Sequence, residues 1–371
     1  IQDNLGRTVQ TVESIRPMRP GRDVRLSIDM RIQYLAYREL KAAMQTHRAR
    51  AGSLVMIDVT TGEVLAMVNQ PTFNPNDRTQ LKPAGYKNRA VTDLVEPGST
   101  IKPFVVAAAL ASGKYRSDSI IDTSPGMVKV GIKVIEDKHN LGAIDLATAL
   151  ARSSNVAMTR IALTLGADNL HGALSSFGFG RVTASGYPGE SAGLLTQPAH
   201  WRPITTATVS YGYGLSATPL QIAHAYATLG AYGVQRPVSF AKIDQSVPGE
   251  RILPDAVARD VVGMLRSVVA EGGTGKLANI PGYSVAGKTG TAWKASAGGY
   301  STNRYLAVFA GLAPASNPRV ATVVVIDEPS AGLYYGGDVA APVFSSVVGG
   351  ALRLLAVAPD MPLDDYSDQM P

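Results

Sequence analysis

The chain has 371 residues, of which 45% are hydrophobic and none is cysteine, and it carries a formal net charge of +6. This composition supports a well-packed fold of one large or two modest domains, and it excludes disulfides, thiolate metal sites and cysteine nucleophiles. The Lys and Arg residues are scattered, which argues against nucleic-acid binding, and no apolar stretch approaches the roughly 18 residues of a membrane span.

The N-terminal part of the chain predicts a helix followed by a hairpin. Residues 1–22 resemble a strand remnant and a linker, and 26–28 is predicted as a short strand. Apolar residues recur at helical spacing over 29–47, which indicates an amphipathic helix. Two apolar-rich runs, 52–59 and 63–69, flank a Thr-Thr-Gly turn and predict a β-hairpin.

The C-terminal part predicts three more strands and a closing helix. The strands are expected at 283–292, 305–312 and 319–327, and the helix at about 340–355. Strands from both ends of the chain, with a helix near each terminus, predict one antiparallel sheet covered by those helices, an α/β protein of the α+β kind. The middle of the chain, about 100–278, is predicted to be a mainly helical insertion.

A Ser-x-x-Lys motif stands at the start of a predicted helix. Ser99 follows a Glu-Pro-Gly turn signal and precedes the apolar run 104–111, so Lys102 is expected one helical turn away on the same face. There a lysine amine can take the proton of the serine hydroxyl and activate it for acyl transfer. The alternative is that Ser99 is only an N-cap and Lys102 a solvated first-turn side chain. A second match, Ser239 to Lys242, lies in a predicted strand, where residues three apart point to opposite faces and cannot act together.

Two further motifs carry polar side chains of catalytic type. Ser153 and Asn155 follow a helix-like segment and place a hydroxyl and an amide two positions apart, although 301–303 is an equal match by pattern. Lys288-Thr289-Gly290-Thr291 lies inside the predicted strand 283–292. This strand could bind a substrate carboxylate along its edge, since glycine permits close backbone approach, or it could be an ordinary surface strand.

Metal and nucleotide sites are not expected. The glycine-rich segments 211–214 and 271–275 lack the P-loop spacing, so nucleotide binding is disfavoured. No metal ion or other cofactor is predicted, because the histidines show no paired ligand spacing. They are His47, His139, His171, His200 and His224.

In the order Ser-x-x-Lys, Ser-x-Asn and Lys-Thr-Gly, the three motifs resemble those of the penicillin-recognising serine acyltransferases. The neighbouring sequence is most similar to class B penicillin-binding proteins of the division type, the penicillin-binding protein 3 type, over nearly all of 23–358. The segments that carry this resemblance are 96–104, 153–158, 210–215, 287–292, 309–314 and 334–344.

The resemblance implies a penicillin-binding protein and serine β-lactamase-like transpeptidase fold. Its transpeptidase domain would cover 23–365, after a remnant of an N-terminal pedestal domain and before a tail at 366–371. A sheet subdomain (about 23–95 and 280–358) and a helical subdomain (about 96–279) would hold the active site at their junction.

The resemblance also implies a role for each motif residue. Ser99 would attack the carbonyl between the two terminal D-alanines of a peptidoglycan stem peptide and form an acyl-enzyme. Lys102 would be the general base, as a neutral amine whose pKa is depressed by burial and by the Lys288 cation. Ser153 would relay a proton to the leaving amine, and Asn155 would hold the donor peptide and Lys102.

The strand motif would bind the end of the donor peptide. Lys288, Thr289 and Thr291, with Gly290 between them, would receive the terminal carboxylate. The backbone amides of Ser99 and Thr291 would form the oxyanion hole. A second stem peptide's amine would then complete a cross-link, and β-lactam antibiotics would acylate the same serine.

The expected setting is septal cell-wall synthesis at the bacterial inner membrane. By resemblance, the chain would be a periplasmic domain anchored by an N-terminal helix outside these residues, with a glycan polymerase and other cell-division proteins as partners. A β-lactamase or carboxypeptidase is one alternative, but no counterpart of a water-activating glutamate is recognisable. A non-catalytic binding or sensor module is another, and the retention of all the motif side chains argues against it.

One position departs from the division type. Trp293 stands where that type usually carries a basic residue. It could be an exposed aromatic at the end of a strand. The alternative is that Trp293, with Tyr334 and Tyr335, supplies a stacking wall that changes substrate or antibiotic preference, in which case the chain could be a paralogue of the housekeeping enzyme.

Overall fold

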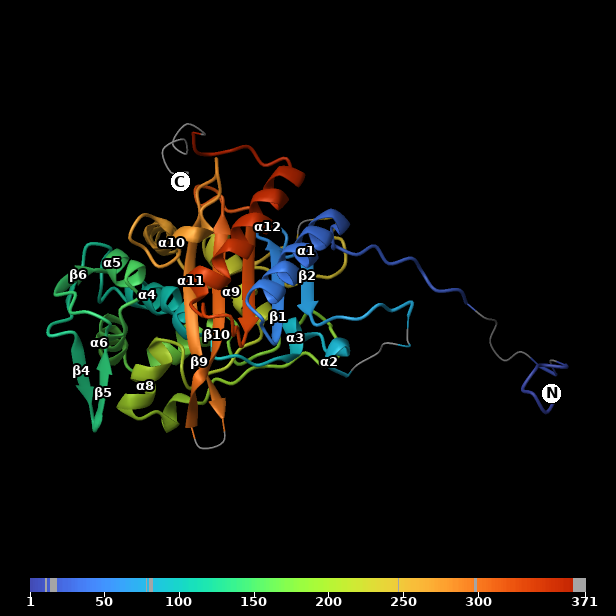
Figure 1. Ribbon diagram of the computed structural model, residues 1–371, viewed down its shortest axis with the longest axis horizontal. Helices are drawn as coiled ribbons and strands as arrows, with labels where there is room; N and C mark the ends of the chain where they lie inside the picture. The colour runs from blue at the N-terminus through green and yellow to red at the C-terminus, as the bar shows by residue number, and fades with distance from the viewer. Residues whose placement is uncertain are drawn as a thin grey trace.

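A single antiparallel sheet of five strands forms the centre of the protein, in the order β2-β1-β11-β10-β9 (Figure 1). The computed structural model describes residues 1–10, 12–13, 19–77, 79, 83–245, 247–296 and 299–362, so the expected tail at 366–371 lies outside the described residues. The strands are β1 (Ala51–Asp58), β2 (Val64–Gln70), β9 (Ala286–Ser296), β10 (Gly299–Ala313) and β11 (Val320–Asp327). The sheet joins strands from both ends of the chain, which confirms the prediction.

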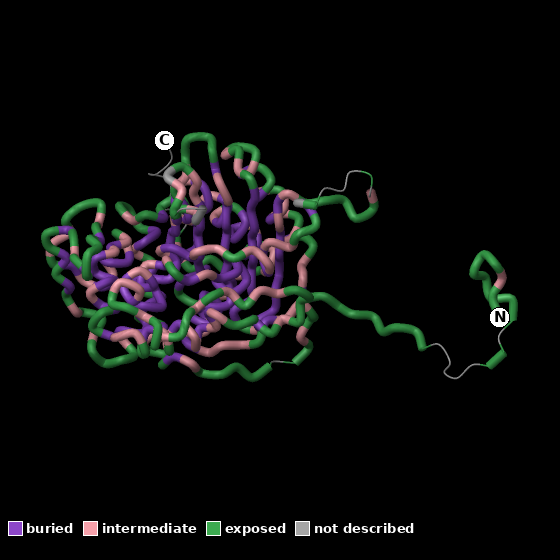
Figure 2. The backbone as a smooth tube through the Cα atoms, turned by 90° about the horizontal axis from the view of Figure 1, so that it is seen from below, coloured by how far each residue is buried: buried purple, intermediate pink, exposed green. Residues whose placement is uncertain are grey.

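Helices cover both faces of this sheet. Helices α1 (Met30–Thr46) and α12 (Ala341–Leu354) pack together on one face and α9 (Pro219–Gly230) on the other. Asp29 caps α1 by accepting a hydrogen bond of 2.9 Å from the Arg31 amide, as a helix-starting aspartate should. All residues of α9 are buried, because it lies between the sheet and the helical part of the chain. Figure 2 shows the buried backbone concentrated in this central region.

The described residues in the middle of the chain are mainly helical and include three small two-stranded sheets. The longer helices there are α4 (Lys102–Ala111), α5 (Leu146–Ala151), α6 (Asn155–Leu165), α7 (Ala167–Ser176), α8 (Pro203–Ser210) and α10 (Asp255–Val269). The small sheets pair β3 (Ile120–Asp122) with β6 (Ala143–Asp145), β4 (Met127–Val130) with β5 (Lys133–Glu136), and β7 (Val234–Gln235) with β8 (Glu250–Arg251). Short helical segments complete the fold: α2 (Pro83–Tyr86), α3 (Arg89–Thr92), α11 (Gly336–Val339), and 3₁₀ turns at Gly98–Ile101, Pro198–His200 and Lys276–Ala278. Strands of two to four residues are too short for a periodic sequence signal.

The predicted short strand at 26–28 was wrong. Leu26 makes only an isolated bridge to Ala241, because the segment meets its neighbour at a single residue pair. Ser239 and Lys242 do not form a pair: the Ser239 hydroxyl donates to the Ala241 carbonyl, and Lys242 Nζ lies 2.8 Å from a Glu63 carboxylate oxygen.

The N-terminal residues extend away from the rest of the chain (Figures 1 and 2). Within residues 1–10, Gln2 and Thr8 form a bridge, and the Ile1 ammonium donates to the Gln10 carbonyl at 2.7 Å. Among the residues that the structure describes, no helix combines the length and the apolarity needed to cross a bilayer.

Helix α4 is anchored in the core by one aromatic side chain. The Phe104 ring centroid lies 4.7 Å from that of Phe177, 5.3 Å from that of Phe179 and 5.4 Å from that of Tyr226. The Tyr226 hydroxyl donates a hydrogen bond of 2.9 Å to the Thr100 carbonyl. The turn before α4 is therefore held to α9, the central helix of the fold.

Candidate active site

Ser99 lies in the 3₁₀ turn Gly98–Ile101, which leads directly into α4. Ser99 is not an N-cap: the cap positions are Pro97 for the turn and Ile101 for α4. Lys102 is fully buried. The interpretation of these residues as a cap and a solvated side chain is therefore excluded.

A glycine-rich loop, residues 211–214, packs against the turn that carries Ser99. The Gly98 amide donates to the Gly212 carbonyl at 3.2 Å, and both glycines have positive φ, +53° and +91°. A Cβ on Gly212 would lie 2.0 Å from the Gly98 carbonyl oxygen. Only glycine fits at position 212. The glycine-rich loop 211–214, for which no nucleotide site was expected, therefore positions the turn that carries Ser99.

Gly212→Ala is expected to destabilise the fold by more than about 1 kcal/mol and to slow acylation, because the added methyl group must displace the Gly98 backbone. Urea unfolding and the rate of penicillin labelling would measure the two effects. Gly172→Ala is the matched control, since its Cβ meets no atom within 4 Å and its φ is not in the left-handed range. Equal behaviour of the two variants would contradict the proposed support.

The structure brings the five predicted catalytic side chains into one hydrogen-bond network. Ser153 Oγ donates to Ser99 Oγ at 3.0 Å. Lys102 Nζ donates to the Ser153 carbonyl at 2.6 Å and to Asn155 Oδ1 at 2.8 Å, and it lies 3.1 Å from Ser153 Oγ. Lys288 Nζ donates to Ser153 Oγ at 3.1 Å. The expected direct hydrogen bond between Ser99 and Lys102 does not occur between these two described side chains. The Ser153 carbonyl oxygen and Asn155 Oδ1 instead hold the Lys102 amine next to Ser153.

Burial acts on the pKa values of both lysine amines in the same direction. The pKa of Lys102 lies well below its ordinary value, first because the amine is buried and then because Lys288 is close, while Asp137 opposes the shift. Burial also lowers the pKa of Lys288, to about 7. Each amine can therefore be neutral at a pH where an exposed lysine is charged.

The rate constant for acylation by penicillin is expected to fall as the pH falls through the pKa of Lys102. The sign follows from the direction of the shift: a lowered lysine pKa leaves the neutral amine dominant down to an unusually low pH, and protonation below it removes the base. Stopped-flow measurement between about pH 5 and about pH 9 tests this. A rate constant that still rises about tenfold per pH unit up to about pH 9, as a base at the ordinary lysine value of about 10.4 would give, would contradict it.

Asp137 is a site residue that the sequence interpretation missed. Its carboxylate accepts hydrogen bonds from the amides of Asn155 (2.5 Å) and Val156 (3.1 Å) and from the Ser154 hydroxyl (2.5 Å). It lies just after β5, and β6 and α5 separate it from the motif, so no spacing pattern connects it to Ser153-Ser154-Asn155. Ser153 itself has a φ of +58°, an uncommon left-handed conformation of the kind often found at functional sites.

The Lys288–Thr291 segment lies on β9, an edge strand of the sheet, against the Ser99 turn. A Cβ on Gly290 would lie 3.0 Å from the Pro97 carbonyl oxygen, so glycine at this position lets the residues before Ser99 pack closely against β9. The Thr289 hydroxyl lies 2.8 Å from that of Thr274, and Thr291 Oγ1 accepts a hydrogen bond of 3.0 Å from the Gly336 amide.

The predicted aromatic wall does not form as one cluster. Trp293 is half-exposed, and its amide donates to the Tyr213 hydroxyl at 3.3 Å. Tyr334 stacks on Tyr305 with centroids 4.1 Å apart and contacts Tyr335. No ring contact among the described residues joins Trp293 to Tyr334 or Tyr335, since different elements carry them.

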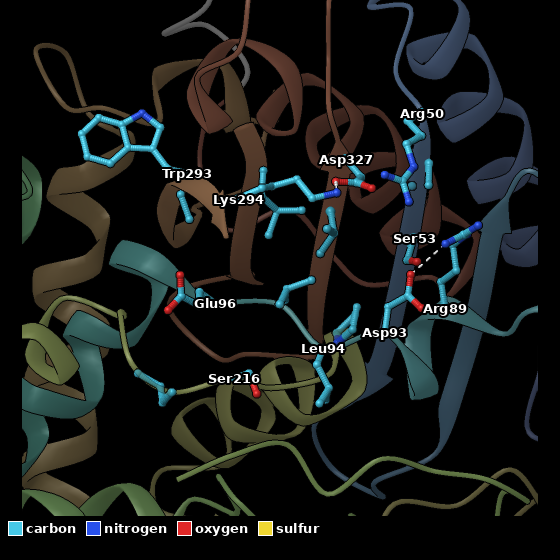
Figure 3. Close-up of a pocket in the computed structure, with 18 of the residues that line it drawn as sticks. Arg50, Ser53, Arg89, Asp93, Leu94, Glu96, Ser216, Trp293, Lys294 and Asp327 are labelled. Carbon is cyan, nitrogen blue, oxygen red and sulfur yellow. Dashed lines mark hydrogen bonds and ion pairs between the residues drawn. The ribbon is translucent and has the colours of Figure 1, made fainter. Parts of the chain in front are cut away.

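A cavity of about 510 Å³ lies beside the Ser99 turn (Figure 3). Glu96, Leu94, Trp293 and Lys294 are among its lining residues, whereas Ser99 is not. In Figure 3 the Trp293 ring points away from the other labelled side chains, and Lys294 Nζ pairs with Asp327 at 2.6 Å. The cavity therefore adjoins the hydrogen-bond network rather than containing it. The part of the chain that the structure describes contains no group of three His, Cys, Asp or Glu residues placed to hold a metal ion.

Comparison with known proteins agrees with the geometry. The family "Penicillin binding protein transpeptidase domain" matches residues 52–349. The chain is 45% identical over 359 residues to "Peptidoglycan D,D-transpeptidase FtsI" of Escherichia coli K12, covering 97% of this chain and 60% of that protein. It is 43% identical to "Probable peptidoglycan D,D-transpeptidase PenA" of Neisseria meningitidis serogroup A, covering 98% and 62%.

The structure is similar to the apo transpeptidase domain of Burkholderia pseudomallei penicillin-binding protein 3. The TM-score is 0.85 at 40% identity, covering 92% of this chain and all of that domain. The chain spans about 60% of the length of the curated relatives that it matches. With the match extending over the sheet, the helical middle and all three motifs, the chain belongs to the penicillin-binding protein transpeptidase domain family.

Proposed function

We propose that this chain is a peptidoglycan D,D-transpeptidase domain that cross-links stem peptides through an acyl-enzyme on Ser99 and is acylated there by β-lactams. The observation that carries the proposal is the network joining Ser99 Oγ to two buried amines through Ser153 Oγ. An activated serine beside buried bases is the arrangement that nucleophilic acyl transfer requires.

The proton path from Ser99 to Lys102 runs through Ser153. A neutral lysine amine has two protons to donate, and the two shortest contacts of Lys102 Nζ, to the Ser153 carbonyl and Asn155 Oδ1, accept both. Its lone pair is then free toward Ser153 Oγ, 3.1 Å away. In the structure Ser153 Oγ donates to Ser99 Oγ, and for reaction both hydroxyls rotate so that Ser99 donates to Ser153 and Ser153 to Lys102. As Ser99 Oγ bonds to the donor carbonyl, its proton then passes to Ser153 and that of Ser153 to Lys102. When the peptide C–N bond breaks, a proton returns through Ser153 to the leaving D-alanine.

The β9 edge supplies the remaining groups. Lys288, which belongs to the network, is proposed to receive the donor carboxylate together with Thr289 and Thr291, with Gly290 between them. The amides of Ser99 and Thr291 are proposed as the oxyanion hole, each worth about 3–4 kcal/mol in the transition state. Trp293 and, separately, the pair Tyr334 and Tyr335 are proposed to contact the rest of the substrate or antibiotic.

The biological setting is part of the same proposal. Similarity to proteins named peptidoglycan D,D-transpeptidase FtsI supports a role in septal wall synthesis. The chain would act in the periplasm as part of an inner-membrane protein, with a glycan polymerase and other cell-division proteins as partners. If Trp293 changes the preference for substrate or antibiotic, the chain serves as a paralogue, and if it does not, as the housekeeping enzyme.

Intact-mass spectrometry after brief exposure to benzylpenicillin tests the proposal. A single penicilloyl adduct is expected, mapped by peptide to Ser99 and absent in Ser99→Ala. Incubation with a pentapeptide donor and an amine acceptor should release D-alanine and yield the cross-linked product. Labelling that persists in Ser99→Ala would refute the assigned nucleophile.

The same samples separate the alternatives. Steady turnover of nitrocefin, in place of one stoichiometric burst, would identify a β-lactamase. D-alanine release without a cross-linked product would identify a carboxypeptidase. Complete absence of labelling would favour a binding module.

A further inference from the structure

We infer that Asp137 is a positioning residue for catalysis, which fixes the Ser-x-Asn turn and holds a negative charge beside the Lys102 amine. The inference rests on the proposed function, since it concerns the base of that reaction. Asp137 belongs to none of the three motifs and acts on the reacting atoms through other residues.

The Asp137 carboxylate organises the start of α6. One oxygen, Oδ1, accepts the amides of Asn155 and Val156, the first two residues of that helix, and the other accepts the Ser154 hydroxyl. Amides at a helix start have no partner within the helix, and a carboxylate there also complements the helix dipole. Ser154 already caps α6, because its hydroxyl accepts a hydrogen bond from the Ala157 amide. Asp137 therefore adds hydrogen bonds to a helix start that is already capped.

That turn carries both groups that hold the proposed base. Lys102 Nζ donates to the Ser153 carbonyl and to Asn155 Oδ1, and Asn155 in turn donates its amide to Asp137. Two hydrogen bonds thus connect the carboxylate to the amine through Asn155. Ser153 has a left-handed backbone conformation, which is unfavourable for serine and persists only when neighbouring contacts enforce it. The hydrogen bonds that Asp137 makes to the residues after Ser153 are such contacts.

Asp137 is itself fixed independently of α6. Its amide donates to the Gly126 carbonyl at 3.0 Å, and the Nζ of the next residue, Lys138, lies 4.2 Å from the Tyr335 ring centroid. Figure 1 shows the β4–β5 sheet beside α6. The loop after β5 therefore places its carboxylate from a separate structural unit, as a support rather than as part of the motif.

Asp137 affects Lys102 through its charge as well as through the hydrogen bonds that it makes. The charged groups that act on Lys102 are Lys288 on β9, which lowers the pKa of Lys102, and Asp137, which raises it. These opposing effects set the pKa of Lys102. If it were too high, the amine would stay protonated, and if it were too low, the amine would be too weak a base to accept the serine proton. Asp137 thereby preserves part of the basicity that burial removes.

Asp137→Asn tests the inference through the pH profile of benzylpenicillin acylation. Asparagine retains an acceptor for the two amides but loses the charge. The acid limb is expected to move to lower pH, because Lys102 loses a neighbour that favours its protonated form. At high pH the rate constant is expected to fall roughly tenfold, since a weaker base accepts the serine proton less readily.

Two further variants make the test specific. Asp137→Glu retains the charge on a longer side chain, so the limb should stay near its wild-type position while the plateau falls. Asp145→Asn is the matched control, because Asp145 caps α5 through the Thr148 amide at 2.7 Å and its carboxylate does not act on Lys102. It should leave the limb in place.

The outcomes distinguish the inference from its premise. A slower Asp137→Asn with an unmoved limb would show only a structural role and overturn the inference. A limb shifted to higher pH would show that water had entered around Lys102, and would overturn it too. If Asp137→Asn does not fold, a shifted limb in Asp137→Glu would contradict it. Failure of the wild type to form the Ser99 adduct would instead refute the proposed function.

Discussion

Lys102→Met is expected to slow acylation of Ser99 by penicillin by a factor of about 10²–10⁴, the usual contribution of a general base. Methionine is similar in length and apolar, so it can occupy the buried site without a charge that must be desolvated. The Ser153 carbonyl and Asn155 Oδ1 lose their donor, so the free energy of unfolding should fall by about 1–3 kcal/mol, and the variant should still fold. Stopped-flow labelling and urea unfolding of the same preparation would show activity lost and the folded state retained.

Lys102→Arg provides the matched control for that prediction. Arginine retains a donor and a positive charge but does not lose its proton in proteins, so it cannot serve as a base. It should be as inactive as Lys102→Met and less stable, because a permanent charge replaces an amine that is readily neutral when buried. An arginine variant with near wild-type labelling would mean that Lys102 acts only by its charge.

Phe104→Ala is expected to lower the free energy of unfolding by about 3–5 kcal/mol, the usual cost of removing a buried phenylalanine. Its ring is completely buried among Phe177, Phe179 and Tyr226. Since native proteins are stable by only about 5–15 kcal/mol, the loss is a large share of the total. Chemical denaturation with benzylpenicillin absent would measure it.

The same variant should also affect the site. Phe104 lies one half-turn beyond Lys102 on α4, so a cavity there loosens the helix that carries the proposed base. Phe73→Ala is the control, because that ring is 37% exposed and contacts only the Tyr86 ring among the described aromatic residues. A loss of stability in Phe73→Ala equal to that of Phe104→Ala would show that core burial is not the cause.

Much of the sheet was predictable because its strands are long and apolar. The hairpin of β1 and β2 and the strand β11 begin and end within about two residues of their predicted bounds, as do α1 and α12. The strands β9 and β10 depart further, because they continue as a paired hairpin to Ser296 and Gly299, beyond the predicted 283–292 and 305–312. The other errors lie where the sequence signal is short. Residues 26–28 form a single bridge instead of a strand, and the hairpin of β4 and β5 was not expected. A strand of three or four residues depends on its neighbour more than on its own composition.

The sequence alone identified the residues that are proposed to do the chemistry, because the three motifs keep their spacing and their order. Position i+3 on a helix predicted that Lys102 would approach Ser99, yet the direct bond was not found, since distant carbonyl oxygens from the Ser-x-Asn turn hold the amine. Only the tertiary structure showed that Ser153 connects the two, that Gly212 supports the serine turn, and that Asp137 fastens Asn155. The physical reason is that side-chain spacing along one element is local, whereas hydrogen bonds, burial and the resulting pKa shifts depend on which elements meet.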